Sequence, residues 1–214
     1  MNASPDAPEG PRARHNRAGV VEAALGILDQ QGLPDLTMRR LAQVLEVRPS
    51  ALYWHFTSKQ ALLAAVSARI LEPLQRASTD LPSLAAAASV LGSQLRECLL
   101  AHRDAAELVS SSLALGLVDP PLHGLLGMVA ERVDAPDRLA RTTAEAVTHF
   151  VIGHAFHEQQ RRHAEALGVR DSSERPAATT ASTPADGGET DFTQVLDLIA
   201  AGVAAQLRHG ARSR

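Results

Sequence analysis

Three side chains that can contact nucleic acid follow one another in the sequence, at Tyr53, Trp54 and His55. A folded surface rarely leaves such rings together on a short helix unless a partner covers them. Tyr and Trp combine a flat apolar ring with a polar tip, which suits phosphates, sugars and the methyl group of thymine. The run therefore predicts contact with DNA, although an ordinary pair of packed helices is the alternative that the spacing leaves open.

Two short helices joined by a tight turn would position these rings, within residues 36–59. Thr37 is expected to cap the first helix, because its hydroxyl can accept a hydrogen bond from an orphan backbone N–H. Pro49 suits the first turn of the second helix, on which Leu52 and Phe56 would point inward. The first helix also carries an apolar stripe at three- and four-residue spacing: Met38, Leu41, Ala42 and Leu45. This pattern is typical of a helix-turn-helix whose second helix enters a major groove.

The composition favours an all-α protein of one large or two small domains. Apolar residues make up 45% of the 214 residues and aromatic residues only 3%, which favours helices over sheet. Cys98 is the only cysteine, so no internal disulfide is possible and a reducing compartment is expected. No secretory signal is recognised, and no apolar run approaches the ~18 residues that a membrane span needs. The sequence therefore predicts a cytoplasmic protein.

The charge of the chain is unevenly distributed. The formal net charge is -3, but residues 12–60 contain seven basic and four acidic side chains. A locally positive end on an acidic body would confine attraction for phosphate to that end. Because the excess is small, we expect modest affinity for non-specific DNA.

Turn signals and changes in composition divide the chain. Residues 1–14 are predicted to be a disordered arm, 15–60 a DNA-binding domain, and 61–210 an effector-binding and dimerisation domain. The small, polar residues 170–190 predict a mobile loop in this second domain. Further helices are expected at residues 16–31, 58–71, 84–102, 105–117, 121–132 and 137–167, with a last helix near the C-terminus.

The last helix carries an apolar stripe that must pack against another element. We expect it to pair with the helix over 137–167, so that two helices from each of two chains form a four-helix dimer interface. The residues predicted at this interface are Phe150, Val195, Leu196, Ile199 and Val203.

The chain resembles the TetR family of bacterial transcriptional repressors. The match is carried by Thr37, Arg39 and the strings at 41–43, 52–55 and 59–63, and more loosely by 102–104 and 148–150 with Gly153. The likeness covers about residues 16–168. It implies an all-α homodimer with an N-terminal helix-turn-helix, followed by a helical domain that binds an effector. The expected function is ligand-responsive repression at a palindromic operator, without enzymatic activity.

The resemblance also implies which residues contact DNA. The implied phosphate contacts are Thr37, Tyr53, Trp54, His55 and Lys59. The implied readers of base edges are Arg39, Pro49, Ser50 and Ala51. Two positions depart from the family pattern. Glu46 stands where a turn glycine is usual, so the turn is either strained or different in shape, and Pro49 offers no side-chain donor.

The effector pocket implied by the resemblance departs further from the family pattern. Its positions are Gln75, Leu91, Leu95, Val109, Ser112, Leu113 and His157. Val109 stands where tetracycline-responsive members of the family have a metal-binding histidine, and it has no donor atom for magnesium. The implied effector is therefore a more apolar small molecule, oriented by His157, Ser112 and His154, and no cofactor is expected.

Other functional classes are weaker alternatives. His154, His157 and Glu158 could form a metal sensor, because imidazoles three or four residues apart can share a transition metal. Without an effector, the chain would be a simple DNA-binding regulator. Ser110, Ser111 and Ser112 have His102 and Asp104 nearby, but that spacing builds no recognisable catalytic triad. Cys98 is expected to be a core residue.

Overall fold

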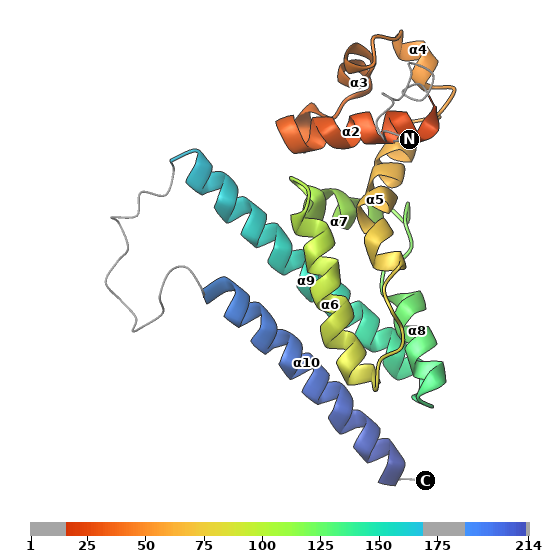
Figure 1. The fold of residues 1–214 in the computed structure, drawn as a ribbon, viewed down its shortest axis with the longest axis vertical. Coiled ribbons are helices and arrows are strands. Elements are labelled where there is room, and N and C mark those ends of the chain that lie inside the picture. Colours follow the sequence, from red (N-terminus) through yellow and green to blue (C-terminus); the bar gives the residue numbers. More distant parts are fainter. Residues whose placement is uncertain (1–15, 169–186, 213–214) are drawn as a thin grey trace, which may run out of the picture.

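A computed structural model describes residues 16–168 and 187–212, and all regular structure in these ranges is helical. One end of the molecule, here called the head, contains three α-helices and a single 3-10 turn (Figure 1). These are α2 (Arg17–Gln31), η1 (Leu33–Asp35), α3 (Met38–Val44) and α4 (Pro49–Leu52). The helix α5 (Lys59–Gln75) leads from the head into the rest of the chain, here called the body.

The body consists of five helices, α6 (Leu84–Leu100), α7 (Ala105–Ala114), α8 (His123–Arg132), α9 (Asp137–Ala166) and α10 (Gly187–Arg212). The long helices α9 and α10 run antiparallel to each other, and α6 packs against both (Figure 1). Gly92 permits this close approach. A Cβ atom added there would lie 2.9 Å from Val147 Cγ1 on α9 and 3.0 Å from Leu196 Cδ2 on α10.

Short polar side chains begin several of the helices, because their oxygen atoms accept from a backbone N–H of the first turn. Asn16 caps α2, Thr37 caps α3, Ser58 caps α5 and Ser83 caps α6. Gly32 ends α2 with a φ of 90°, a region that L side chains rarely adopt. The predicted cap at Thr37 and the predicted stop at Gly32 are thus confirmed.

Several predicted boundaries require correction. The second helix of the helix-turn-helix ends at Leu52, not at Phe56, and α5 continues to Gln75 with Pro73 in its last turn. The predicted arm at 1–14 lies outside the described residues, as does most of the predicted loop at 170–190. Residues 187–190 of that loop belong instead to α10.

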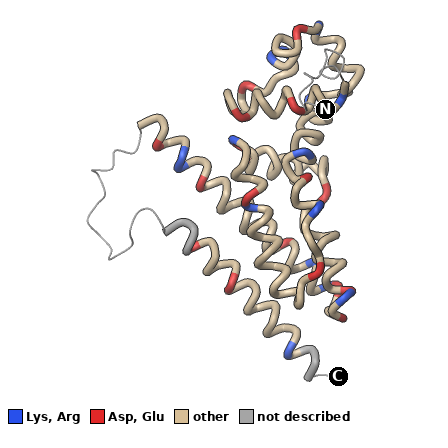
Figure 2. The backbone as a smooth tube through the Cα atoms, in the orientation of Figure 1, with Lys and Arg blue, Asp and Glu red and all other residues tan. Residues whose placement is uncertain are grey.

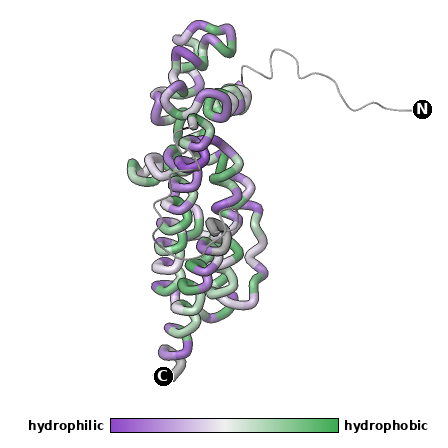
Figure 3. The backbone as a smooth tube through the Cα atoms, turned by 90° about the vertical axis from the view of Figure 1, so that its left-hand side faces the viewer, coloured by the Kyte–Doolittle hydropathy of each residue, from purple (hydrophilic) through white to green (hydrophobic). Residues whose placement is uncertain are grey.

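Most helices place apolar side chains on one side and polar side chains on the other. Figure 3 shows the two kinds alternating along the tube of the chain. The buried apolar residues form one continuous core through the head and the body. Within the described ranges, no helix is both long and apolar enough to cross a membrane.

Candidate nucleic-acid interface and ligand pocket

The short helix α4 is fixed from beneath by two apolar side chains. Leu52 and Phe56 are both almost completely buried, as the sequence predicts. The guanidinium carbon of Arg17 lies 4.7 Å from the centre of the Phe56 ring, so α2 covers this ring from the other side. With these anchors buried, Pro49 and Ser50 remain exposed and Ala51 is half-buried.

Tyr53 and Trp54 project from the turn that follows α4. Their side chains are 52% and 89% exposed, whereas the neighbouring His55 is half-buried. Removing apolar rings from water is favourable. A nearly fully exposed Trp54 therefore indicates a surface that a partner covers. The aromatic run therefore lies at the accessible end of the head.

The helix α3 presents one free and one bound arginine. Arg40 donates from Nε to Oε1 of Gln31 on α2, at 3.0 Å, and its backbone N–H donates to the Thr37 hydroxyl at 3.1 Å. Arg39 is exposed, and no side-chain hydrogen bond or ion pair to another described residue is found for it. Lys59, at the start of α5, is also exposed. The residues predicted to contact DNA thus come from α3, α4, the following turn and the start of α5.

The sequence left open whether Glu46 strains the turn between α3 and α4 or changes its shape, and the structure shows the strained turn. Glu46 has a φ of 57°, in the left-handed region that favours glycine. The backbone N–H of Val47 donates to the Ala42 carbonyl at 3.0 Å and closes the turn. The helix-turn-helix therefore keeps its turn although a glutamate occupies the glycine position.

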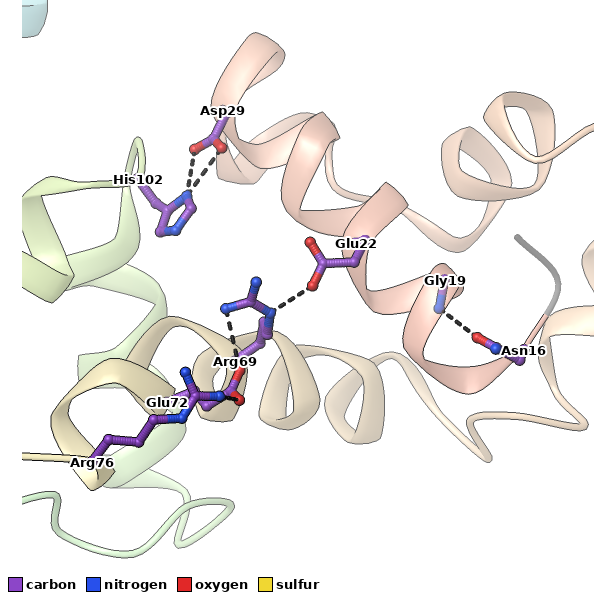
Figure 4. A network of polar contacts seen from close by, with 8 residues as sticks. All are labelled: Asn16, Gly19, Glu22, Asp29, Arg69, Glu72, Arg76 and His102. Carbon is purple, nitrogen blue, oxygen red and sulfur yellow. Dashed lines mark hydrogen bonds and ion pairs between the residues drawn. The ribbon is translucent and has the colours of Figure 1, made fainter. Parts of the chain in front are cut away.

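Polar contacts join the head to α5 (Figure 4). Arg69 donates from Nε to Glu22 on α2, at 2.5 Å, and its Nη1 lies 3.3 Å from Glu72. Arg76 also pairs with Glu72. The hydrogen bond that Arg69 donates to Glu22 raises the pKa of Arg69, whose guanidinium stays charged. This network ties α2 to the helix that carries the head.

The turn between α6 and α7 binds the other end of α2. Asp29 accepts from the backbone N–H of Arg103 at 3.1 Å and lies 3.0 Å from Nδ1 of His102. Asp104, at a φ of 54°, accepts from the backbone N–H of Leu33 at 2.9 Å. The residues 102–104, which the sequence analysis named for the resemblance and for the weak triad alternative, therefore attach the body to the head. His102 is thus bonded to Asp29, Asp104 to Leu33 and Ser112 to Ser67, so each of these residues has a packing or positioning role.

The residues predicted to bind an effector do not line one common cavity. Leu91, Leu95 and Val109 are completely buried among core side chains. Ser112 is also buried, and its hydroxyl is hydrogen-bonded to the hydroxyl of Ser67 on α5, at 2.8 Å. These four residues pack the core between α5, α6 and α7.

The other four predicted effector residues lie apart from that cluster. Gln75 lines a cavity of about 720 Å³ between α2, α5 and residues 117–121. Leu113 lines a separate cavity, His157 is exposed, and the ring of His154 packs against the rings of both Phe150 and Phe192. The predicted effector set thus stays a prediction for which the arrangement gives no common pocket.

The cavity that includes Leu113 has the composition of a ligand site. Its volume is about 690 Å³, within the range of small-molecule pockets. It is enclosed by α7, the segment after it, α8 and α9, and its polar lining residues are Ser110, Asp119, His123, Glu145, Thr148 and His149. The buried Thr148 Oγ1 and His123 Nε2 have no hydrogen-bond partner among the described residues. We refer to this space as the α7–α9 cavity.

Sequence reasoning missed most of the α7–α9 cavity. Thr148 and His149 were noticed only as part of a family string, and His123, Asp119 and Glu145 had no role. Their common location depends on how α8 crosses α9, which no local pattern specifies. A bound ligand would provide partners for the two orphan atoms, because buried polar groups are normally hydrogen-bonded.

The carboxylate of the metal-sensor alternative, Glu158, is already paired with two arginines. Glu158 accepts from Nη2 of Arg96 at 2.8 Å and from Nη2 of Arg162 at 2.6 Å. Burial, and then the nearby Arg96, lower the pKa of His154. Over residues 16–168 and the side chains described in α10, no three potential metal ligands converge.

The predicted dimer residues divide into two groups. Leu196 and Val203 are already buried within the single chain, and their role as contacts to a partner stays a prediction. Val195, Ile199 and Phe150 are half-buried, and Phe150 stacks on Phe192 with ring centroids 5.4 Å apart. Leu198 is 71% exposed. Residues 198–207 of α10 contain no charged side chain, and Figure 2 shows this uncharged stretch.

Comparison with known proteins identifies relatives along both parts of the chain. Residues 20–66 match the family model for bacterial regulatory proteins of the tetR family, and residues 79–207 match the tetracyclin repressor-like C-terminal domain. The class D tetracycline repressor of Escherichia coli is 32% identical over 214 residues, which cover 91% of this chain and 92% of that protein.

Two solved structures show the same architecture. The structure of BioQ with its natural double-stranded DNA operator has 36% sequence identity and a TM-score of 0.68, covering 89% of this chain and 98% of that one. A TetR variant from Acinetobacter baumannii AYE, in complex with minocycline, has 25% identity and a TM-score of 0.67, covering 89% and 97%. These similarities extend over the head and the body together.

Proposed function

The chain belongs to the TetR family of bacterial transcriptional regulators, a non-enzymatic family, and we propose that it is a ligand-responsive repressor. It would bind a palindromic operator as a cytoplasmic homodimer and be released by a small, largely apolar effector. The observation that carries this proposal is the nearly fully exposed Trp54 at the end of the head. Polar contacts join this head to α5, and the body contains a cavity of ligand size. BioQ with its operator and the TetR variant with minocycline support the two halves of the proposal.

In the DNA complex, α4, the second helix of each helix-turn-helix, would enter a major groove. Arg39 is proposed to read a guanine edge, together with base contacts from Pro49, Ser50 and Ala51. Contacts from side chains to phosphates would fix the position of the head. The proposed phosphate-binding residues are Thr37, Tyr53, Trp54, His55 and Lys59. Two heads held about 34–36 Å apart would match successive major grooves on one face of the operator.

The dimer is proposed to form through α9 and α10. Val195 and Ile199 remain partly accessible on α10, and the adjacent Leu198 is exposed. An uncharged helix side with exposed apolar residues is suited to a second copy of the same chain, because burying it removes apolar area from water. The geometry of the two heads would then follow from the interface of the bodies.

Effector binding would change the spacing of the heads through α5. The α7–α9 cavity adjoins α7, which is bonded to α5 by the buried pair Ser67 and Ser112. In turn, α5 is bonded to the head by Arg69 and Glu22. An effector needs only to bind the released arrangement more tightly than the DNA-bound arrangement in order to reduce DNA affinity.

A gel-shift experiment tests this function. The purified protein is mixed with its own upstream promoter DNA, with and without a panel of small apolar and polycyclic compounds. We expect a sharp shift that one compound reverses, and a shift only at higher protein concentration with an Arg39→Ala variant. A shift that no compound reverses would favour effector-independent DNA binding, and reversal by zinc or nickel alone would favour a metal sensor.

A further inference from the structure

The titratable groups around the α7–α9 cavity are two carboxylates and two histidines, His123 and His149. Asp119, in the segment after α7, and Glu145, on α9, are its two carboxylates. None of the described residues that line the cavity is lysine or arginine. When His123 and His149 are neutral, an anionic ligand would therefore meet only like charges here, and like charges repel.

Among the described residues, no lysine or arginine pairs with the carboxylate of Glu145. Arg141, one turn earlier on α9, is paired with Asp137. The nearest polar contact of Glu145 is His123 Nε2, at 4.0 Å, which is too long for a hydrogen bond. The Glu145 side chain is 61% exposed, so it lies at the rim of the cavity and does not bear the cost of complete burial.

The inner part of the cavity combines apolar surface with two unused polar atoms. Leu113, Val118 and Ile152 contribute apolar side chains. Thr148 is only 4% exposed and His123 Nε2 is buried, and neither Thr148 Oγ1 nor His123 Nε2 has a hydrogen-bond partner in the part of the chain that the structure describes. A hydroxyl and a neutral imidazole nitrogen can both accept a hydrogen bond from an N–H group. The cavity thus offers an apolar wall, acceptors inside and negative charge at its mouth.

We propose that the effector of this protein is an apolar organic cation of drug size, with Glu145 as its counter-ion and Thr148 as an inner acceptor. This inference rests on the proposed ligand-responsive function and specifies the chemistry of its ligand. The ring system would lie against the apolar wall, and the protonated nitrogen would face Glu145. The effector is thereby distinguished from anionic and neutral compounds of the same shape.

Three compounds with one ring system test the charge preference by calorimetry on protein freed of nucleic acid. At pH 7.5, 9-aminoacridine is a cation, acridine is neutral and acridine-9-carboxylate is an anion. We expect 9-aminoacridine to bind about tenfold more tightly than acridine, and the carboxylate to bind most weakly. Absence of 9-aminoacridine binding, or equal binding of all three compounds, would overturn the proposal.

The variant Glu145→Gln tests the assigned counter-ion. It should weaken 9-aminoacridine binding about tenfold and leave acridine binding unchanged. Glu165→Gln, an exposed position on the same helix outside the cavity, is the matched control and should change neither affinity. Thermal melting of both variants verifies that the fold is intact. An unchanged affinity for the cation in Glu145→Gln would remove Glu145 from the site.

The promoter gel-shift separates this inference from the function on which it rests. If neutral or anionic compounds release promoter DNA best, ligand-responsive repression holds and the cationic effector is wrong. If 9-aminoacridine binds in the expected order but no compound changes the shift, the cation site stands and ligand-responsive repression is wrong.

Discussion

Arg69 on α5 donates a hydrogen bond to Glu22 on α2, with 2.5 Å between Nε and Oε1. The two residues are 47 positions apart in the sequence and belong to the helix that carries the head and to the head itself. Both side chains are about half exposed to solvent, so the pair adds little to the free energy of unfolding. Because the pair joins α2 to α5, we expect it to help α2 follow a movement of α5.

The variant Arg69→Gln tests this coupling. We expect it to lower the free energy of unfolding by no more than about 1 kcal/mol, as is usual for an exposed ion pair. A compound that releases the wild-type protein from promoter DNA should release the variant less effectively, since the head no longer follows α5 as closely. Gel-shift titrations with the compound measure this response. Arg138→Gln, on the distant helix α9, should behave like the wild type; an unaltered response in Arg69→Gln would exclude this route.

Two glycines in and after α2 predict opposite effects of alanine. At Gly32, a Cβ atom would lie 2.7 Å from Asp104 Oδ2, and the φ of 90° is unfavourable for alanine. Gly32→Ala should therefore lower the free energy of unfolding by about 1–3 kcal/mol. At Gly26, a Cβ atom would meet nothing within 4 Å, so Gly26→Ala should raise it by about 0.5–1 kcal/mol. Urea unfolding measures both values, and a stable Gly32→Ala protein would contradict the described contact between head and body.

These two positions illustrate how much the sequence predicted. Gly32 was recognised as a helix stop from its residue type and place, and Thr37 as a cap, because both effects are local. Glu46 was recognised as unusual in its turn, but only its φ of 57° distinguished strain from a different turn. The end of α5 was placed too early, since Pro73 disfavours a helix while the buried Leu74 favours continued packing.

The ligand pocket was less predictable for a different reason. The resemblance supplied positions such as Leu91 and Val109, but it could not show that these apolar side chains fill the core at those places. A cavity is the space that packed side chains leave, so it depends on all of the surrounding residues at once. Thr148 and Glu145 came together only when the crossing of α7, α8 and α9 was known.

The exposed head residues predict a loss of DNA binding without loss of the dimer. Arg39→Ala should weaken operator binding by about 1–3 kcal/mol, because a bidentate contact to guanine is removed. Tyr53→Ala should also weaken it, through loss of a phosphate contact. Gel shifts measure the affinity and sedimentation measures the dimer. If both variants became monomeric, the separation of DNA binding in the head from dimerisation in the body would be wrong.

His154 predicts a dependence of stability on pH. Burial, followed by the charge of Arg96, lowers the pKa of this histidine in the folded protein below its ordinary value of 6.5. The unfolded chain therefore takes up the proton more readily, and stability is lost as the pH falls from about 6.5 through the lower folded pKa. The variant His154→Gln cannot take up this proton, so its melting temperature should fall less between pH 7 and pH 5 than that of the wild type. Identical pH profiles would show that His154 does not titrate in this range.

Neighbouring positions on α10 predict two separate kinds of failure. Leu196 is 2% exposed and packs against Gly92, whose added Cβ atom would lie 3.0 Å from Leu196 Cδ2. Leu196→Asp should therefore bury an unpaired charge and unfold the subunit. Ile199 is only half-buried and is proposed to face the partner, so Ile199→Asp should yield folded monomers. Circular dichroism reports folding, and sedimentation reports the assembly state. A charge at the centre of an apolar interface separates the chains while the core of each chain remains packed. If the Ile199→Asp protein is folded and still dimeric, the dimer contact therefore lies elsewhere.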